Sequence, residues 1–425
     1  MKVFFTFLSF LFVCVFGIYI NNYKIIITYL LLYGVISLVD FFNNKTELKY
    51  YYNCYVFGSL ALLLLFQLDH GTYWGNIDEE LFYEAAIGQY REGFYVSSIR
   101  WGGYYFLLTE YYYFIREFID SSVHFYHGIL LSAFFSSFIP YFFKKYFYKK
   151  LHHITINRLI LVLLFLPQFL IYNVTYLRDS LILLLFSVLV YFIGLRNRNI
   201  LFRFIIIFFI LVLSFSIRPG SSIFLGVYVI FDLFFIEKKK YYLIVGTFIL
   251  VLAIIAWDVN FRDPIEVGKG YIELTEREIS SNSIGQRLLS SNNILLLPLK
   301  MLYILFSPIP PRIVNKVSIH SVVFTIGSLV KYFYLILFLI SAFKNFVSKN
   351  KDIYMIRDTL FIFFIVLGVL FTSRDQRHLN FLFPLVFYYG IEYSFKNKAV
   401  FSKYIFYSII ALPAIFIGYL FFKGS

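Results

Sequence analysis

Three consecutive acids, Asp78, Glu79 and Glu80, are the residues whose type and spacing best suit chemistry. A carboxylate can act as general base toward a hydroxyl, or it can bind a divalent cation that holds a phosphate group. Acids in the first turn of a helix also interact favourably with the helix dipole and need no catalytic role. We take Asp78 and Glu79 as candidate catalytic residues, because a chain with few acids places three of them in succession, and we keep the dipole interpretation as the alternative.

A second candidate set consists of arginines at the ends of apolar segments. A guanidinium donates paired hydrogen bonds to phosphate and stays charged at low dielectric, so several arginines around one cavity would bind a diphosphate. Each arginine alone could instead extend toward lipid headgroups. The neighbouring Asp179 could simply belong to the first turn of its helix, and His378 could be an acid or base or only an interfacial donor. The candidate binding residues are Arg178, Asp179, Arg218, Arg312, Arg374 and Arg377.

The composition shows which elements must position these residues. The chain has 425 residues, of which 60% are hydrophobic and 15% charged, with a mean hydropathy of +0.76. Soluble domains carry about 25% charged residues, so a soluble globular protein is excluded. The apolar residues form runs of roughly 20, the length that crosses a bilayer core. Cys14 and Cys54 lie inside such runs and provide neither a disulfide framework nor a thiolate metal site.

These runs predict an all-α polytopic membrane protein with about thirteen transmembrane helices. Amphipathic interfacial helices are expected in its outer loops. The predicted spans are 3–20, 24–42, 50–68, 122–143, 158–173, 179–195, 201–217, 221–236, 241–257, 319–343, 353–371, 379–395 and 403–422. We expect one integral membrane domain over 1–425, with N-terminal spans in 1–68, an outer loop in 69–121, central spans in 122–257, a second outer loop with a Pro-rich turn in 258–318 and C-terminal spans in 319–425.

The net charge of +14 is distributed as a topology signal. Basic residues gather in alternate short loops, for example at Lys144 and Lys145 and at 238–240, and cytoplasmic loops carry such an excess. The loops form no single patch, so a nucleic-acid partner is not expected. The opposite, extracytoplasmic side then receives the acid-rich segments 69–121 and 258–293 together with the candidate arginines.

The first outer segment contains two expected interfacial helices. Apolar residues in 76–86 recur with the helical period, which is typical of a helix lying at the membrane surface. A second, aromatic segment follows from Trp101, and its charges at Glu110, Arg116 and Glu117 make it a poor span. Lys331 falls within a predicted span, where an ionisable residue is a functional hypothesis by default; a shifted span end is the alternative.

These motifs resemble those of two groups of membrane enzymes. The pattern Asp-x-x-x-x-Tyr-x-x-Ala at Asp78–Ala86, followed by Gly102-Gly103-Tyr104-Tyr105, resembles the first outer loop of GT-C superfamily glycosyltransferases. In that superfamily an acid of this loop is the usual catalytic or metal-binding group. The remaining motifs resemble bacterial O-antigen and capsule polymerases: Leu177-Arg178-Asp179-Ser180-Leu181, Ile217-Arg218-Pro219-Gly220, Ser307-Pro308-Ile309-Pro310 and Arg374 to His378 with Pro384.

The resemblance implies a multi-pass protein of the bacterial inner membrane whose active face is periplasmic. It would polymerise or transfer undecaprenyl-diphosphate-linked glycan units, using outer-loop arginines. The alternatives are a GT-C transferase that adds one sugar from a polyprenyl-phosphate donor and, less favoured, a lipid-linked glycan flippase. No cofactor is required for energy, although a divalent cation at the acids is left open, and no other metal site is expected. The implied partners are the undecaprenyl-diphosphate-linked oligosaccharide, membrane lipid and a chain-length regulator.

Overall fold

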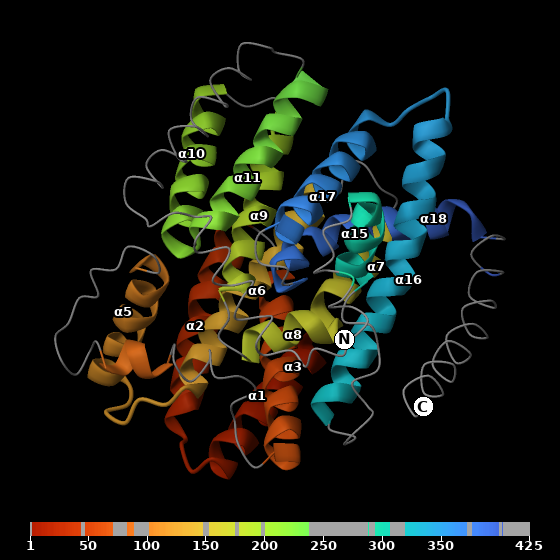
Figure 1. Ribbon diagram of the computed structural model, residues 1–425. Helices are drawn as coiled ribbons and strands as arrows, with labels where there is room; N and C mark the ends of the chain where they lie inside the picture. Colours follow the sequence, from red (N-terminus) through yellow and green to blue (C-terminus); the bar gives the residue numbers. More distant parts are fainter. Residues whose placement is uncertain are drawn as a thin grey trace. The chain divides into compact units, whose positions relative to one another are not determined.

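The computed structural model is drawn in Figure 1. It describes residues 2–43, 47–70, 83–88, 102–147, 153–174, 178–196, 200–237, 288, 294–306, 319–371, 376–398 and 402. These ranges contain helices and no strand, which confirms the all-helical prediction for them. The chain divides into two compact units, 1–221 with 315–327 and 222–314 with 328–425. The single domain over 1–425 stays a prediction.

Within the described residues, six helices are long and apolar enough to cross a membrane, which supports a helical membrane protein. They are Lys24–Phe42, Glu47–Leu68, Tyr126–Phe147, Gly220–Glu237, Thr325–Val347 and Ile353–Leu370. Shorter apolar helices occupy several of the other predicted spans, and the predicted spans 241–257 and 403–422 lie outside the described residues. The count of thirteen is therefore not confirmed.

Unit 1 is built around α3. Its helices are α1 (Lys2–Tyr19), α2 (Lys24–Phe42), α3 (Glu47–His70), α5 (Gly102–Phe118), α6 (Tyr126–Phe147), α7 (His153–Phe165), α8 (Pro167–Val174), α9 (Asp179–Gly194) and α10 (Ile200–Ile217). The α3 helix packs against α1, α2, α6, α7 and α8. Its buried Asn53 accepts a hydrogen bond from the Tyr29 hydroxyl at 2.6 Å and donates one to Thr6 Oγ1 at 3.0 Å. Such polar contacts join helices where lipid provides no hydrophobic driving force.

The predicted span 158–173 is two helices in the structure. The α7 helix ends at Phe165 and α8 begins at Pro167, with Leu166 between them. Proline lacks the backbone N–H that would continue the helical hydrogen bonds, and its ring clashes with the preceding turn. The helix therefore breaks before Pro167. Gly58 allows α8 to approach closely, because a Cβ there would lie 2.9 Å from a Leu170 methyl group.

Unit 2 contains most of α11 (Pro219–Asp232) and of α16 (Ile319–Val347). Its other elements are the π-helical turn η1 (Leu233–Glu237), η2 (Ile294–Leu296), α15 (Leu297–Phe306), α17 (Ile353–Phe371), η4 (Gln376–Leu382) and α18 (Phe383–Lys396). The apolar helix α15 lies within the predicted outer loop 258–318 and was not predicted. The predicted span 379–395 begins as the 3-10 helix η4, and Pro384 lies in the first turn of α18.

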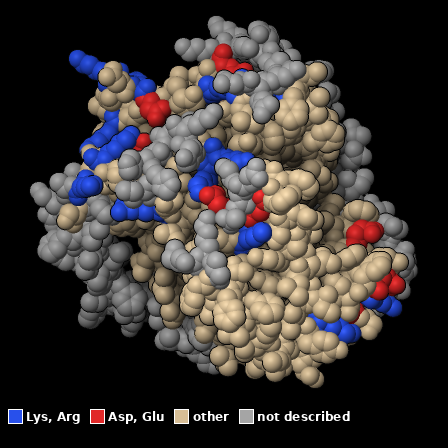
Figure 2. Space-filling view, turned by 180° about the vertical axis from the view of Figure 1, so that it is seen from behind, with Lys and Arg blue, Asp and Glu red and all other residues tan. Residues whose placement is uncertain are grey.

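On the face drawn in Figure 2, charged side chains form small groups separated by broad uncharged areas. The α10 helix is an example, because Leu201, Phe204, Phe209 and Leu213 each expose 48% or more of their surface. Apolar exposure on this scale suits a helix that faces lipid.

Candidate functional site

The structure brings three of the predicted binding residues together in unit 1. Arg178 immediately precedes α9, Asp179 is the first residue of α9, and Arg218 joins α10 to α11. Arg218 Nη1 donates to Asp179 Oδ1 at 2.7 Å, and the two side chains are 18% and 11% exposed. Asp179 thus belongs to the first turn of its helix and also holds Arg218. The group of two arginines and one carboxylate has a formal charge of +1 and remains partly accessible.

The α5 helix reaches the same group. Burial raises the pKa of Tyr104, which also experiences the charges of Arg178 and Asp179. One residue earlier, a Cβ on Gly103 would lie 2.5 Å from Ser216 Oγ and 2.9 Å from the Ser216 carbonyl oxygen. Only glycine permits that approach, so the Gly-rich start of α5 can abut the end of α10. The predicted surface helix is confirmed as a helix, and its buried side lies along Tyr104, Leu108, Tyr112 and Ile115.

The other predicted site residues are not brought together by the described part of the chain. Asp78, Glu79, Arg312 and Arg374 lie outside the described residues, as does the side chain of Arg377. His378 belongs to η4 and is half-buried. In the ranges that the structure describes, no group of three His, Cys, Asp or Glu side chains could hold a metal ion. A cation at Asp78 stays a prediction, since that residue is not among them.

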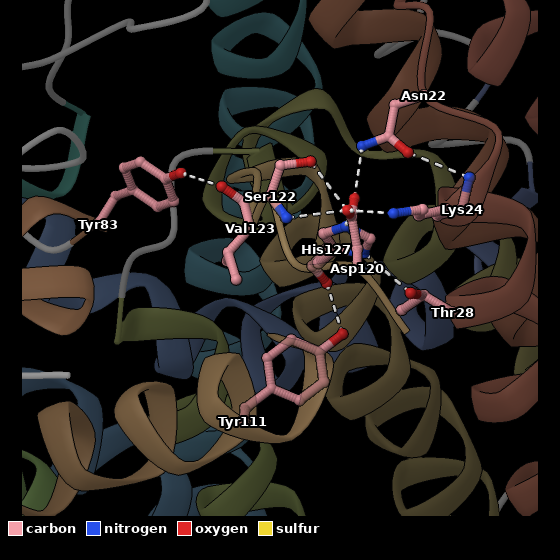
Figure 3. A network of polar contacts seen from close by, with 9 residues as sticks. All are labelled: Asn22, Lys24, Thr28, Tyr83, Tyr111, Asp120, Ser122, Val123 and His127. Atoms are coloured by element: carbon pink, nitrogen blue, oxygen red, sulfur yellow. Dashed lines mark hydrogen bonds and ion pairs between the residues drawn. The ribbon is translucent and has the colours of Figure 1, made fainter. Parts of the chain in front are cut away.

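A polar network centred on Asp120, between α5 and α6, was missed by the sequence interpretation (Figure 3). Its carboxylate accepts hydrogen bonds from Asn22 Nδ2 at 2.9 Å, from Lys24 Nζ at 3.0 Å and from the amide and hydroxyl of Ser122 at 3.0 and 2.8 Å. Burial alone would raise the pKa of Asp120, but these donors together hold it below its ordinary value. Lys24, the first residue of α2, is thus engaged in an ion pair with Asp120.

The same network includes an Asp-His-Thr arrangement. His127 Nδ1 lies 2.8 Å from Thr28 Oγ1, and His127 Nε2 lies 3.6 Å from Asp120 Oδ2. A triad needs a nucleophile that the substrate can reach, whereas Thr28 and His127 are both fully buried. We therefore assign this arrangement a structural role.

That role includes anchoring the segment 69–121, which the sequence predicts to be an outer loop. Tyr83, in the short helix 83–88, donates to the Val123 carbonyl at 2.8 Å, and Tyr111 of α5 donates to the His127 carbonyl at 2.8 Å. Figure 3 shows both tyrosines reaching the stretch that Asp120 holds. The Tyr of the Asp-x-x-x-x-Tyr-x-x-Ala motif is thus an anchor, and its Ala86 is buried.

A second cluster missed by the sequence interpretation lies inside unit 2. Arg357 is fully buried, donates to Asp358 Oδ1 through Nε at 2.7 Å and also pairs with Asp232. Arg357 Nη2 donates to the Tyr228 hydroxyl at 2.7 Å, and the Tyr389 hydroxyl donates to Asp358 Oδ2 at 2.7 Å. The cluster joins α11, α17 and α18. Ionic groups within a membrane protein are costly and often mark sites of function.

Comparison with models of known protein families, with curated proteins and with solved structures gives no match for this chain. The resemblance to glycan polymerases and transferases therefore stands on the motifs alone.

Proposed function

We propose that this protein polymerises or transfers undecaprenyl-diphosphate-linked glycan units outside the cytoplasm. The observation that supports this most is the group of Arg178, Asp179 and Arg218, where three helix ends meet. Asp179 fixes the Arg218 guanidinium, and a second arginine, Arg178, directly precedes this carboxylate in the chain. Guanidinium donors held in this way suit the oxygens of a diphosphate. The broad apolar surface suits a substrate with a polyprenyl chain.

The proposed reaction is a direct displacement. The acceptor hydroxyl oxygen bonds to the anomeric carbon of the donor sugar while the bond from that carbon to the diphosphate oxygen breaks. The arginines stabilise the charge that develops on the departing diphosphate. A base, for which Asp78 and His378 are the candidates, takes the hydroxyl proton. The products are the lengthened glycan and undecaprenyl diphosphate, so no external energy source is needed.

Deletion in the native strain, followed by gel analysis of its lipopolysaccharide or capsule, tests this proposal. A ladder reduced to a single repeat unit is the expected result. A truncated repeat unit would favour the single-sugar transferase, for which metal dependence at Asp78 is the discriminating feature. An unchanged ladder would contradict both the polymerase and the single-sugar transferase.

One observation favours a flippase as a second candidate. The buried cluster of Arg357, Asp232 and Asp358 is of the kind that lines transport pathways in membrane proteins. A flippase predicts that the complete lipid-linked unit accumulates on the cytoplasmic side after deletion. A polymerase predicts that single units reach the outer face, so labelling the lipid-linked units on intact cells distinguishes the two.

A further inference from the structure

One side of α5 carries aromatic and acidic residues in alternation. Gly103, Phe106, Glu110, Tyr113 and Glu117 recur at intervals of three and four residues, which places them on one side of the helix. Phe106 is 55% exposed and Tyr113 is 46% exposed, and both glutamates are exposed as well. These two aromatic and two acidic side chains are named the α5 stripe, which extends over about 16 Å at the rise of an α-helix. The buried side chains of α5 lie on the opposite side of the helix.

The α5 stripe begins where α10 ends. A Cβ on Gly103 would lie 2.5 Å from Ser216 Oγ, so the last turn of α10 contacts α5 on the side of the stripe and at its N-terminal end. Arg218 follows Ser216 by two residues and belongs to the group with Arg178 and Asp179. The arginine group and the α5 stripe are both parts of unit 1. A ligand held by the arginines therefore has the start of the α5 stripe beside it.

The composition of the α5 stripe suits a sugar chain better than lipid. The face of an aromatic ring packs against the C–H groups of a sugar ring, and a carboxylate accepts strong hydrogen bonds from hydroxyl groups. A helix that lies on a membrane surface is instead rich in Lys and Arg, which attract anionic headgroups, and carboxylates are costly in lipid. Both charged residues of the α5 stripe are acids, and Arg116, the only basic residue of α5, lies outside it.

We propose that the α5 stripe binds the sugar portion of the lipid-linked substrate whose diphosphate lies at Arg178 and Arg218. This inference rests on the proposed function and names the part of the substrate that a second surface recognises. The charges orient the substrate, because the acids of the α5 stripe repel the diphosphate and do not repel uncharged sugars. An extended glycan of a few sugar rings follows α5 away from the arginines, with the rings of Phe106 and Tyr113 against its sugars.

Binding to the full-length protein in neutral nanodiscs tests this inference with two probes. One is the undecaprenyl-diphosphate-linked repeat unit extracted from the native strain, and the other is undecaprenyl diphosphate without sugar. Phe106→Ala and Tyr113→Ala should each weaken binding of the glycan-linked probe about fivefold, the loss expected for one aromatic contact, and should leave binding of the sugar-free probe unchanged. Phe106→Tyr should retain binding because it keeps the ring. Arg218→Ala should weaken binding of both probes.

Phe118→Ala is the matched control. Phe118 is 74% exposed on the same helix but lies outside the α5 stripe, where its ring is 5.0 Å from that of Phe114. This variant should bind both probes as the parent does. Glu110→Gln should weaken binding of the glycan-linked probe about threefold, because a neutral amide oxygen accepts weaker hydrogen bonds than a carboxylate.

Parental affinity for the glycan-linked probe in both Phe106→Ala and Tyr113→Ala would overturn the inference. An equal loss of affinity for the two probes would also overturn it, because the α5 stripe would then contact the lipid portion or the membrane surface. If the parent protein binds the two probes equally, the sugar makes no contact, and the inference fails while the proposed function stands. A parent protein that binds neither probe would remove the proposed function and this inference together.

Discussion

Replacing Arg218 by alanine tests the diphosphate interpretation of the group in unit 1. The side chain is 18% exposed and donates to Asp179 at 2.7 Å. A donor whose contact strengthens in the transition state is worth roughly 3 kcal/mol, so the rate should fall about a hundredfold. Arg218→Lys should recover only part of it, because an ammonium group cannot reproduce the planar fork.

The same change has a stability cost that can be estimated separately. Breaking a fully buried ion pair costs about 3–5 kcal/mol, whereas exposed pairs contribute about 0–1 kcal/mol. With side chains 18% and 11% exposed, this pair lies between those limits, at about 1–3 kcal/mol. Asp179→Asn is the matched variant, since it removes the ion pair and keeps the guanidinium. Lys396→Ala removes an exposed ion pair, in which the lysine is 68% exposed, and should change neither the rate nor the stability.

Both quantities are measured on purified variants, as the rate of repeat-unit consumption and as the thermal midpoint. We expect Asp179→Asn to lose stability and a modest part of the rate, and Arg218→Ala to lose far more rate for a similar loss of stability. Equal rate losses in the two variants, in proportion to their stability losses, would refute the reasoning and leave Arg218 as a structural residue.

Three further predictions concern the Asp120 network, the contact of α5 with α10 and the membrane topology. The pKa of Asp120 lies below its unfolded value of about 3.9, so the stability that this carboxylate contributes is present above that pH and lost as the pH falls toward the folded-state pKa. The thermal midpoint should therefore fall steeply in acid for the parent protein and less for Asp120→Asn. Parallel curves of midpoint against pH would contradict this. Gly103→Ala should destabilise the protein by about 1–3 kcal/mol through overpacking. Gly34→Ala is the control, because a Cβ there would meet nothing within 4 Å, and it should be neutral or slightly stabilising in melting experiments. Equal thermal midpoints for the two variants would refute the close approach of α5 to α10 at Gly103. Reporter fusions at Lys145 should report cytoplasm and those at Asn282 periplasm, and a cytoplasmic Asn282 would remove the outer active site.

Much of the helical architecture follows from the sequence, because apolar runs of span length have few alternatives to a membrane helix. The positions of helix ends within those runs depend on individual residues, which the length of an apolar run does not indicate. Pro167 divides one predicted span, and Pro384 lies where η4 gives way to α18. The α15 helix was missed because its apolar run contains Lys300 and is only 10 residues long.

The polar sites were predicted less well than the helices. Arg178, Asp179 and Arg218 were recognised because their position at helix ends is visible in the sequence. Asp120 was not, since its partner Lys24 is 96 residues away and nothing local indicates the pairing. Arg357 lies beside Asp358 in a predicted span, a signal that a search for charges inside spans would have found.

Synthesis by the isolated protein tests most directly the proposal that it joins lipid-linked glycan units. Purified protein in nanodiscs is supplied with undecaprenyl-diphosphate-linked repeat units alone, and the products are resolved by chain length. We expect glycans of increasing length, with one undecaprenyl diphosphate released for each bond formed, and loss of both products in Arg218→Ala. Units that remain unchanged with active parent protein, or that merely cross the bilayer without a new bond, would contradict it.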